Sequence, residues 1–217
     1  QFDLDEYFGQ LNRLKEQYKG KLDLRIGVEI GLQKHLGEAY HRLTEAYPFD
    51  FVIGSVHLVG GQDPYYRKIF EGRTDEEVYR MAFREILENV EAVKDFDALG
   101  HLDYVVRYGI HQAAEYSYRK FSDEIDAVLK KLIAEGKGLE MNLAGIKYGL
   151  GFPNPHPDVL KRYRELGGEI ITIGADAHEP AHVAYEFEKA TEILRECGFS
   201  YYAEFHGRKP VFQRIVP

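Results

Sequence analysis

The strongest constraint on the fold of this chain is a regular alternation between helical periodicity and short apolar runs. Helical spacing of apolar residues is found over residues 4–18, 35–47, 74–94, 118–135, 158–166 and 180–197. Strand-like runs lie between them, at residues 22–30, 51–56, 96–102, 138–142, 169–174 and 201–205. This alternation predicts βα units, and hence an α/β protein with a parallel sheet or barrel whose strands all end at one face.

The length and composition fit one globular domain spanning residues 1–217, since single domains commonly have about 100–200 residues. Acidic residues outnumber basic ones by 36 to 28, which makes a nucleic acid partner unlikely on electrostatic grounds. No apolar run reaches the roughly 18 residues of a membrane span, so we expect no membrane partner. Cys197 is the single cysteine, and without an internal disulfide the chain is expected to be cytoplasmic.

Side chains able to bind metal ions stand where the predicted strands end. They are Glu29, His57, His101 with Asp103, Glu140 with Asn142, Asp176 with His178, and Glu204 with His206. In βα barrels the carboxyl ends of the strands build the active site. Imidazole and carboxylate groups bind Zn²⁺, Mn²⁺ or Fe ions, and a bridging carboxylate can hold two ions about 3.5–4 Å apart. The coincidence at several strand ends favours a metal centre.

Each of these residues also has a plainer interpretation. A single histidine after a strand is more often a cap or a core residue than a ligand. Glu29 alone could be a solvated strand end, and Asp176 alone could cap the helix that begins near Pro180. The role of His206 stays open. We expect the remaining histidines to lie at the surface: His35, His41, His111, His156 and His182.

Four motifs carry a family resemblance over nearly the whole chain. They are Gly27-Val28-Glu29, Gly54-Ser55-Val56-His57, Gly100-His101-Leu102-Asp103-Tyr104-Val105-Val106-Arg107-Tyr108 and Gly174-Ala175-Asp176-Ala177-His178. In order and spacing they resemble the PHP (polymerase and histidinol phosphatase) family, and most closely its histidinol-phosphatase branch. The resemblance implies a distorted (β/α)₇ TIM-like barrel with a trinuclear metal centre.

The resemblance also implies a role for each metal ligand. Glu29 matches the bridging carboxylate, and His57 and His101 match the two histidines of the second metal site. Asp176 matches the aspartate of the first site, and His178 matches a histidine of the third. An intact family member would hold two or three divalent ions, namely Zn, Mn or Fe.

The sequence departs from the family pattern at its start. The family opens with a His-x-His strand and a Thr-Glu-His motif, and neither is present here. We therefore expect the first one or two βα units to be missing, with fewer bound ions and an open barrel edge. The chain begins at Gln1 without a Met or a signal peptide, which is expected either of a piece that starts inside a longer protein or of a processed start.

The function implied by the resemblance is metal-dependent phosphomonoester hydrolysis. The substrate would be L-histidinol phosphate, converted with water into L-histidinol and phosphate in histidine biosynthesis, by a metal-activated hydroxide that attacks phosphorus. The expected catalytic residues are Asp103, Asp176 and His178. Asp103 would either protonate the leaving group or orient a histidine.

Substrate-binding roles are expected for three further residues. Arg107 could clamp the phosphate with its planar guanidinium, and the resemblance suggests Lys147 as a second phosphate ligand. Asn142 could orient the substrate. The alternative for Arg107 and Lys147 is an ordinary surface charge. Two alternative functions stay open: another PHP-type phosphoesterase, such as a nuclease or nucleotide phosphatase, and a catalytically incomplete fragment that acts as an interaction module.

Overall fold

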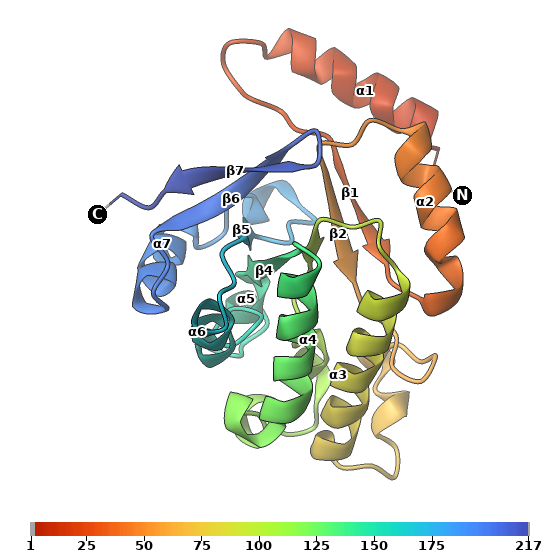
Figure 1. The fold of residues 1–217 in the computed structure, drawn as a ribbon, viewed down its shortest axis with the longest axis vertical. Helices are drawn as coiled ribbons and strands as arrows, with labels where there is room; N and C mark the ends of the chain where they lie inside the picture. Colours follow the sequence, from red (N-terminus) through yellow and green to blue (C-terminus); the bar gives the residue numbers. More distant parts are fainter. Residues whose placement is uncertain (1–2, 217) are drawn as a thin grey trace.

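A five-stranded parallel sheet forms the centre of the molecule (Figure 1). The computed structural model describes residues 3–216. The strands follow one another in chain order: β1 Gly27–Gly31, β2 Phe51–Ser55, β3 Ala98–Leu99, β4 Gly138–Asn142 and β5 Ile171–Gly174. Every neighbouring pair is parallel, so the predicted α/β class is confirmed. Within the described residues β1 and β5 are the two edges, and the sheet stays open rather than closing into a barrel.

Helices connect the strands in the predicted order. They are α1 Leu4–Gln17, α2 Gly37–Ala46, α3 Asp75–Ala92, α4 Ser122–Ala134, the short α5 Ala144–Lys147, α6 Pro157–Glu165 and α7 Phe187–Glu196. A capping box begins α3, with Thr74 and Glu77 bonding reciprocally. None of the described helices is long and apolar enough to cross a bilayer.

Two of the predicted helices are interrupted. The segment 118–135 opens with a 3₁₀ turn at Tyr118–Phe121 before α4. The segment 180–197 begins with a 3₁₀ turn at Pro180–His182, and α7 starts only at residue 187. Ala184 and Glu186 between them have positive φ angles of 57° and 58°, which a continuous α-helix does not tolerate.

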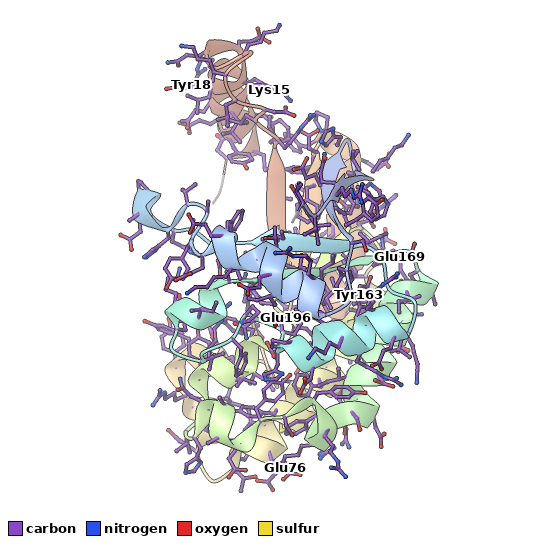
Figure 2. All side chains as sticks on the ribbon, turned by 90° about the vertical axis from the view of Figure 1, so that its left-hand side faces the viewer. Lys15, Tyr18, Glu76, Tyr163, Glu169 and Glu196 are labelled. Carbon is purple, nitrogen blue, oxygen red and sulfur yellow. The ribbon has the colours of Figure 1, made fainter. Side chains whose placement is uncertain are left out.

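The helices lie against the sheet and one another, except for the far end of α1. Figure 2 shows Lys15 and Tyr18 on a helix end that extends away from the body of the molecule. It also shows Tyr163 of α6 beside α7, and Tyr163 stacks on Phe199 just beyond α7 with ring centroids 6.5 Å apart. Both rings are buried, so they belong to the apolar core that holds the strands in place.

The predicted strand 96–102 is much shorter in the structure. β3 covers only residues 98 and 99, because the chain turns at His101, whose carbonyl accepts a hydrogen bond from Tyr104 N at 2.7 Å. Gly100 lies so close to β2 that a Cβ atom there would be 2.3 Å from Ser55 Oγ. The absence of a side chain at residue 100 therefore lets the ends of β2 and β3 approach each other.

The sixth predicted strand does not join the parallel sheet. β6 Tyr201–His206 pairs in an antiparallel hairpin with β7 Lys209–Arg214, a strand that the sequence analysis did not predict. The turn is Gly207-Arg208, and both residues have positive φ angles, 55° and 63°. A glycine in a two-residue turn is a known hairpin signal. The expectation that Glu204 and His206 end a strand at the same face as the other polar residues is therefore wrong.

The hairpin turn packs at the amino ends of the parallel strands. Phe205 stacks on Phe51, the first residue of β2, with centroids 4.7 Å apart. Arg208 donates to both carboxylate oxygens of Asp97, at 3.0 and 3.2 Å. His206 lies beside this turn, and its nearest carboxylate is Glu204 at 3.9 Å. The open question about His206 is thus answered: it lies at the end of the sheet opposite to the strand ends that carry Glu29, His57 and His101.

Removing the Arg208 side chain should destabilise the protein. Asp97 is 7% exposed in its ion pair with Arg208 and also accepts Val52 N at 2.8 Å, so Arg208→Ala would leave a nearly buried carboxylate without its cation. We expect a loss of about 2–4 kcal/mol, near the lower end of the range for breaking a buried ion pair. Urea unfolding measures it, with Lys209→Ala at the exposed neighbouring position as control. Equal unfolding midpoints for the two variants would refute this role.

Candidate metal centre

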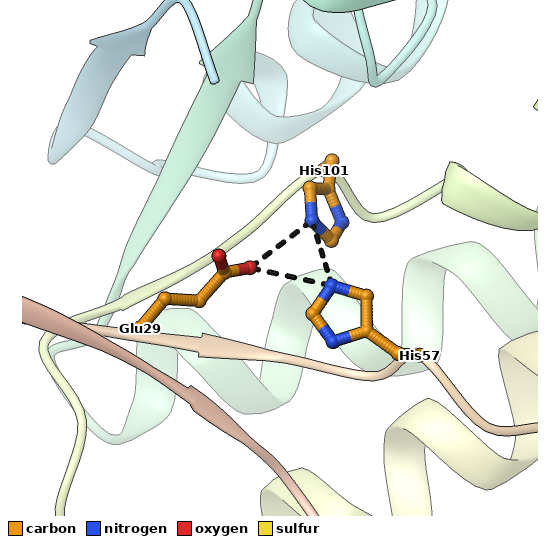
Figure 3. A group of neighbouring side chains, drawn as sticks. All are labelled: Glu29, His57 and His101. Atoms are coloured by element: carbon orange, nitrogen blue, oxygen red, sulfur yellow. Dashed lines mark hydrogen bonds and ion pairs between the residues drawn. The ribbon is translucent and has the colours of Figure 1, made fainter. Parts of the chain in front are cut away.

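Glu29, the middle residue of β1, meets His57 and His101, which lie two residues beyond the carboxyl ends of β2 and β3 (Figure 3). Oε1 of Glu29 lies 3.2 Å from Nε2 of His101 and 3.4 Å from Nε2 of His57. The two Nε2 atoms are 3.3 Å apart. The three donor atoms thus form a nearly equilateral triangle at the predicted face of the sheet.

The size of this triangle fits a transition-metal ion. Zn²⁺ binds histidine nitrogen and carboxylate oxygen at about 2.0–2.1 Å, and tetrahedral ligands at that distance lie about 3.3 Å from one another. Two imidazoles and one carboxylate also match the borderline donors that Zn²⁺, Mn²⁺ and Fe²⁺ accept. Three protein ligands leave further coordination positions open, as catalytic metal sites require.

The electrostatics of Glu29 suit a metal ligand. Burial acts to raise the pKa of its carboxyl group, but hydrogen bonds with His101 and His57 outweigh burial and hold the pKa well below its usual value. Glu29 is therefore ionised at neutral pH and presents a negative charge to the two imidazoles. A cation between the three donors would replace those hydrogen bonds by stronger contacts.

Tyr104 packs against both imidazoles from the loop after β3. Its ring centroid lies 5.1 Å from that of His57 and 4.9 Å from that of His101. His101 is almost fully buried, whereas His57 and Glu29 keep about a third of their side-chain surface exposed. The triangle is thus open on one side, where a substrate can approach.

The predicted residues Asp176, Arg107, Lys147 and Asn142 form a second group. Arg107 Nη1 donates to Asp176 Oδ2 at 3.2 Å, and Arg107 Nη2 donates to Asn142 Oδ1 at 3.2 Å. Lys147 Nζ donates to the backbone oxygen of Asp176 at 3.4 Å. Asp176 has a φ of 50°, an uncommon conformation that often marks functional residues. Arg107 therefore contacts the carboxylate of Asp176 and Lys147 contacts its backbone oxygen, two residues after the end of β5.

Arg107 is not the exposed surface charge of the plainer interpretation. Its side chain is 2% exposed, and its guanidinium carbon lies 5.2 and 4.9 Å from the ring centroids of Tyr104 and Tyr148. Asn142 is buried next to Arg107, and its Oδ1 also accepts a hydrogen bond from Ala144 N at 3.0 Å. Asn142 therefore holds Arg107 in place.

Asp103 and His178 lie outside the triangle. Asp103 is fully buried, with Oδ1 accepting from Asn154 Nδ2 at 2.5 Å and Oδ2 from His156 N at 2.9 Å. Both oxygens thus hold the loop after α5, so the expected general-acid or histidine-orienting role of Asp103 does not match its position. His178 is 80% exposed, and its Nδ1 lies 3.1 Å from the backbone oxygen of Asp176.

Glu140 was predicted at a strand end but was given no role, and Asn154 was not predicted as a site residue. Glu140 Oε2 accepts His101 N at 3.0 Å and Asn142 Nδ2 at 3.1 Å. Asn154 is fully buried and accepts Arg107 Nε at 2.7 Å. A signal for Glu140 existed: a charged residue inside an apolar strand, two positions before Asn142 and so on the same face. Asn154 lies in a Gly- and Pro-rich loop and gave none.

The other histidines follow the surface prediction in part. His35, His41 and His111 are exposed, while His156 and His182 are half-buried. His156 Nδ1 accepts Asp158 N at 3.1 Å and so caps α6. In the part of the chain that the structure describes, Glu29, His57 and His101 form the single cluster of three potential metal ligands.

Comparison with known proteins identifies the family. The family model of the PHP domain matches residues 2–144 of this chain. The chain belongs to the PHP family. A probable histidinol-phosphatase of Clostridium acetobutylicum is 32% identical over 211 residues, which cover 97% of this chain and 77% of that relative. A histidinol-phosphatase of Lactococcus lactis is 31% identical over 95% of this chain and 77% of its own.

Solved structures of PHP-family relatives have the same fold. The crystal structure of histidinol phosphate phosphatase from Lactococcus lactis, complexed with Zn, L-histidinol and phosphate, superposes with a TM-score of 0.83 at 29% identity. The match covers 97% of this chain and 80% of that one. A putative histidinol phosphatase from Listeria monocytogenes gives a TM-score of 0.71 at 18% identity, which supports the fold alone.

Replacing Glu29 by Gln should abolish tight metal binding. The substitution keeps the shape of the side chain but removes the charge that faces both imidazoles. We expect the Zn²⁺ dissociation constant to rise by more than the roughly 10–100-fold that loss of an outer-shell partner costs. Isothermal titration with Zn²⁺ measures it, and His111→Ala, an exposed histidine outside the triangle, is the control. Parental affinity in Glu29→Gln would show that the triangle is not the metal site.

Proposed function

We propose that this chain hydrolyses L-histidinol phosphate to L-histidinol and phosphate, with divalent metal ions as cofactors. The observation that carries the proposal is the triangle of Glu29, His57 and His101 in a chain that matches histidinol-phosphatases over nearly its whole length. The Lactococcus lactis enzyme with zinc, histidinol and phosphate has the same fold. In the reaction a P–O bond to water forms, the P–O bond to histidinol breaks, and the leaving oxygen gains a proton.

The triangle would hold one metal ion, at the position that resembles the second site of the family. When bound, a divalent ion there supplies Lewis acidity, which makes coordinated water more acidic and offsets charge on the phosphoryl oxygens. We assign Asp176 to the first site and His178 to the third; an intact family member would hold two or three ions of Zn, Mn or Fe, and this chain fewer. In support, Asp176 Oδ1 and His178 Nδ1 lie 3.5 Å apart.

Arg107 and Lys147 supply positive charge for the phosphate. Arg107 is fixed by Asp176, Asn142 and the tyrosine rings, so its guanidinium loses little freedom when an anion binds. Lys147 is half-buried on α5, and its ammonium group lies beside the backbone of Asp176. Together they would orient a phosphomonoester next to the metal ligands. Asp103 contributes indirectly, by holding Asn154 and through it Arg107.

The cytoplasm is the compartment that we propose for this enzyme. Cys197, the single cysteine, is a free thiol, and burial raises its pKa to about 11. A thiol of that kind is unreactive at neutral pH, so it serves neither as a nucleophile nor as a disulfide partner. These properties agree with a reducing compartment and with hydrolysis that uses no cysteine intermediate.

Phosphate release from a panel of substrates tests the proposed function. With Zn²⁺ or Mn²⁺ present, histidinol phosphate should be hydrolysed with a kcat/KM at least about tenfold above that for nucleoside monophosphates, since one specific charged hydrogen bond is worth that much. Single-stranded DNA should not be cut, and EDTA should abolish activity. Preference for a nucleotide or DNA would indicate another PHP-type phosphoesterase, and no activity with metal bound would indicate a non-catalytic module.

Lys147→Ala should weaken substrate binding more than chemistry. Loss of a charged hydrogen bond to phosphate costs about 1.5–3 kcal/mol, so we expect KM for histidinol phosphate to rise about 10–100-fold while kcat changes much less. Steady-state kinetics at saturating metal separate the two constants. Lys161→Ala, on helix α6, is the matched control. If KM is unchanged in Lys147→Ala, Lys147 does not contact the phosphate.

A further inference from the structure

A buried carboxylate, Glu140, lies between the metal triangle and Arg107. It projects from β4, is 4% exposed, and takes part in no ion pair among residues 3–216. Both of its recorded hydrogen-bond donors, His101 N and Asn142 Nδ2, are neutral. On the β5 side, a Cβ atom at Gly174 would lie 2.1 Å from Glu140 Oε1, so only glycine leaves room for this side chain.

The burial of Glu140 has an energetic cost that its neutral partners do not fully offset. A buried carboxylate is stabilised when a cation lies nearby, and it is costly without one. Two carboxylates approach the same histidine: Glu29 Oε1 lies 3.2 Å from the His101 ring nitrogen, and Glu140 Oε2 accepts the His101 backbone N–H at 3.0 Å. A cation held by the triangle would compensate both charges.

Glu140 is also a main support of His101. Metal-binding histidines usually donate their second ring nitrogen to a carboxylate or carbonyl group, which fixes the ring. In His101 the second nitrogen, Nδ1, is buried and has no hydrogen-bond partner among the described residues. The residue is instead held by its backbone N–H, which donates to Glu140, and by the ring of Tyr104.

The same carboxylate oxygen reaches Arg107 through one intermediate. Glu140 Oε2 accepts from Asn142 Nδ2, and Asn142 Oδ1 accepts from Arg107 Nη2. This chain of hydrogen bonds fixes which end of the Asn142 amide faces Arg107, because the amide can donate to Glu140 only if its oxygen faces the guanidinium. His101 and Arg107 are thus both connected to the buried carboxylate of Glu140, His101 directly and Arg107 through Asn142.

We propose that Glu140 is a positioning residue that sets His101 for metal binding and, through Asn142, sets Arg107 for phosphate binding. The substrate half of this inference rests on the proposed function, whereas the metal half does not. Glu140 touches neither the metal donors' ring atoms nor open space, so it acts through its two neighbours. The negative charge of Glu140 lies next to the backbone N–H of His101 and adds to the negative charge of the metal site.

Three variants test this role. Glu140→Gln keeps the volume and one acceptor oxygen but removes the charge, and we expect its Zn²⁺ dissociation constant to rise about 10–100-fold, as for other outer-shell partners. Asn142→Ala removes the hydrogen bonds to Arg107, Glu140 and Ala144 N but keeps the contact of Glu140 with His101, so KM for histidinol phosphate should rise while Zn²⁺ affinity stays within a few-fold of the parent. Thr172→Val, at the buried position paired with Glu140 on β5, is the control and should change neither.

Zinc titration is measured on each variant after its metal is removed, and steady-state kinetics and urea unfolding are measured with metal bound. A purely structural Glu140 would lower the stability of Glu140→Gln and leave the Zn²⁺ affinity of the folded protein unchanged, which would overturn the proposal. If Glu140→Gln does not fold, an unchanged KM in Asn142→Ala still refutes the link to Arg107. If the parent protein does not hydrolyse histidinol phosphate, the proposed function fails, yet the zinc titration still decides the role of Glu140.

Discussion

The contact between the Glu29 carboxylate and the imidazoles of His57 and His101 is the interaction on which the site depends. It joins the ends of three strands that are neighbours in the sheet, so it exists only if β1, β2 and β3 are parallel and in register. Gly100 allows β2 and β3 to come close enough for the two rings to meet. The fold and the chemistry therefore share one geometric requirement.

Three charged side chains near the candidate site are buried. Arg107, Asp103 and Glu140 are all nearly inaccessible, and each is held by side-chain amides or backbone N–H groups. Asn142 and Asn154 connect them into one network around Arg107. Such a network is costly to bury unless every member is satisfied, and it yields a rigid arrangement in return. A rigid cationic group beside metal ligands suits the recognition of a phosphomonoester.

Local patterns predicted most of the fold. The helix at Thr74 and the strand at residues 138–142 were predicted with almost their true bounds, because capping residues and apolar runs act locally. The β6–β7 hairpin was missed, since alternation in residues 201–205 reveals a strand but not its direction relative to the sheet. That direction is set by distant contacts, above all the pairing of Arg208 with Asp97. β3 was predicted too long, because the chain turns at His101, whose carbonyl accepts Tyr104 N.

Site residues could be predicted from the sequence where a metal-binding side chain lies at the end of a predicted strand. Glu29, His57 and His101 met this condition, and the structure brings them together. Asp103 met it too, but it points into the loop after α5, and no local pattern gives that direction. Glu140 was predicted at a strand end without a role, because a buried carboxylate inside a strand shows its role only when its partners are known.

The most direct test of the account is a crystal structure of the Zn²⁺-loaded protein with anomalous scattering measured at the zinc edge. The account predicts a zinc peak about 2.0–2.1 Å from Glu29 Oε1, His57 Nε2 and His101 Nε2. Zinc peaks elsewhere in the molecule, with the three side chains still bonded only to one another, would contradict it.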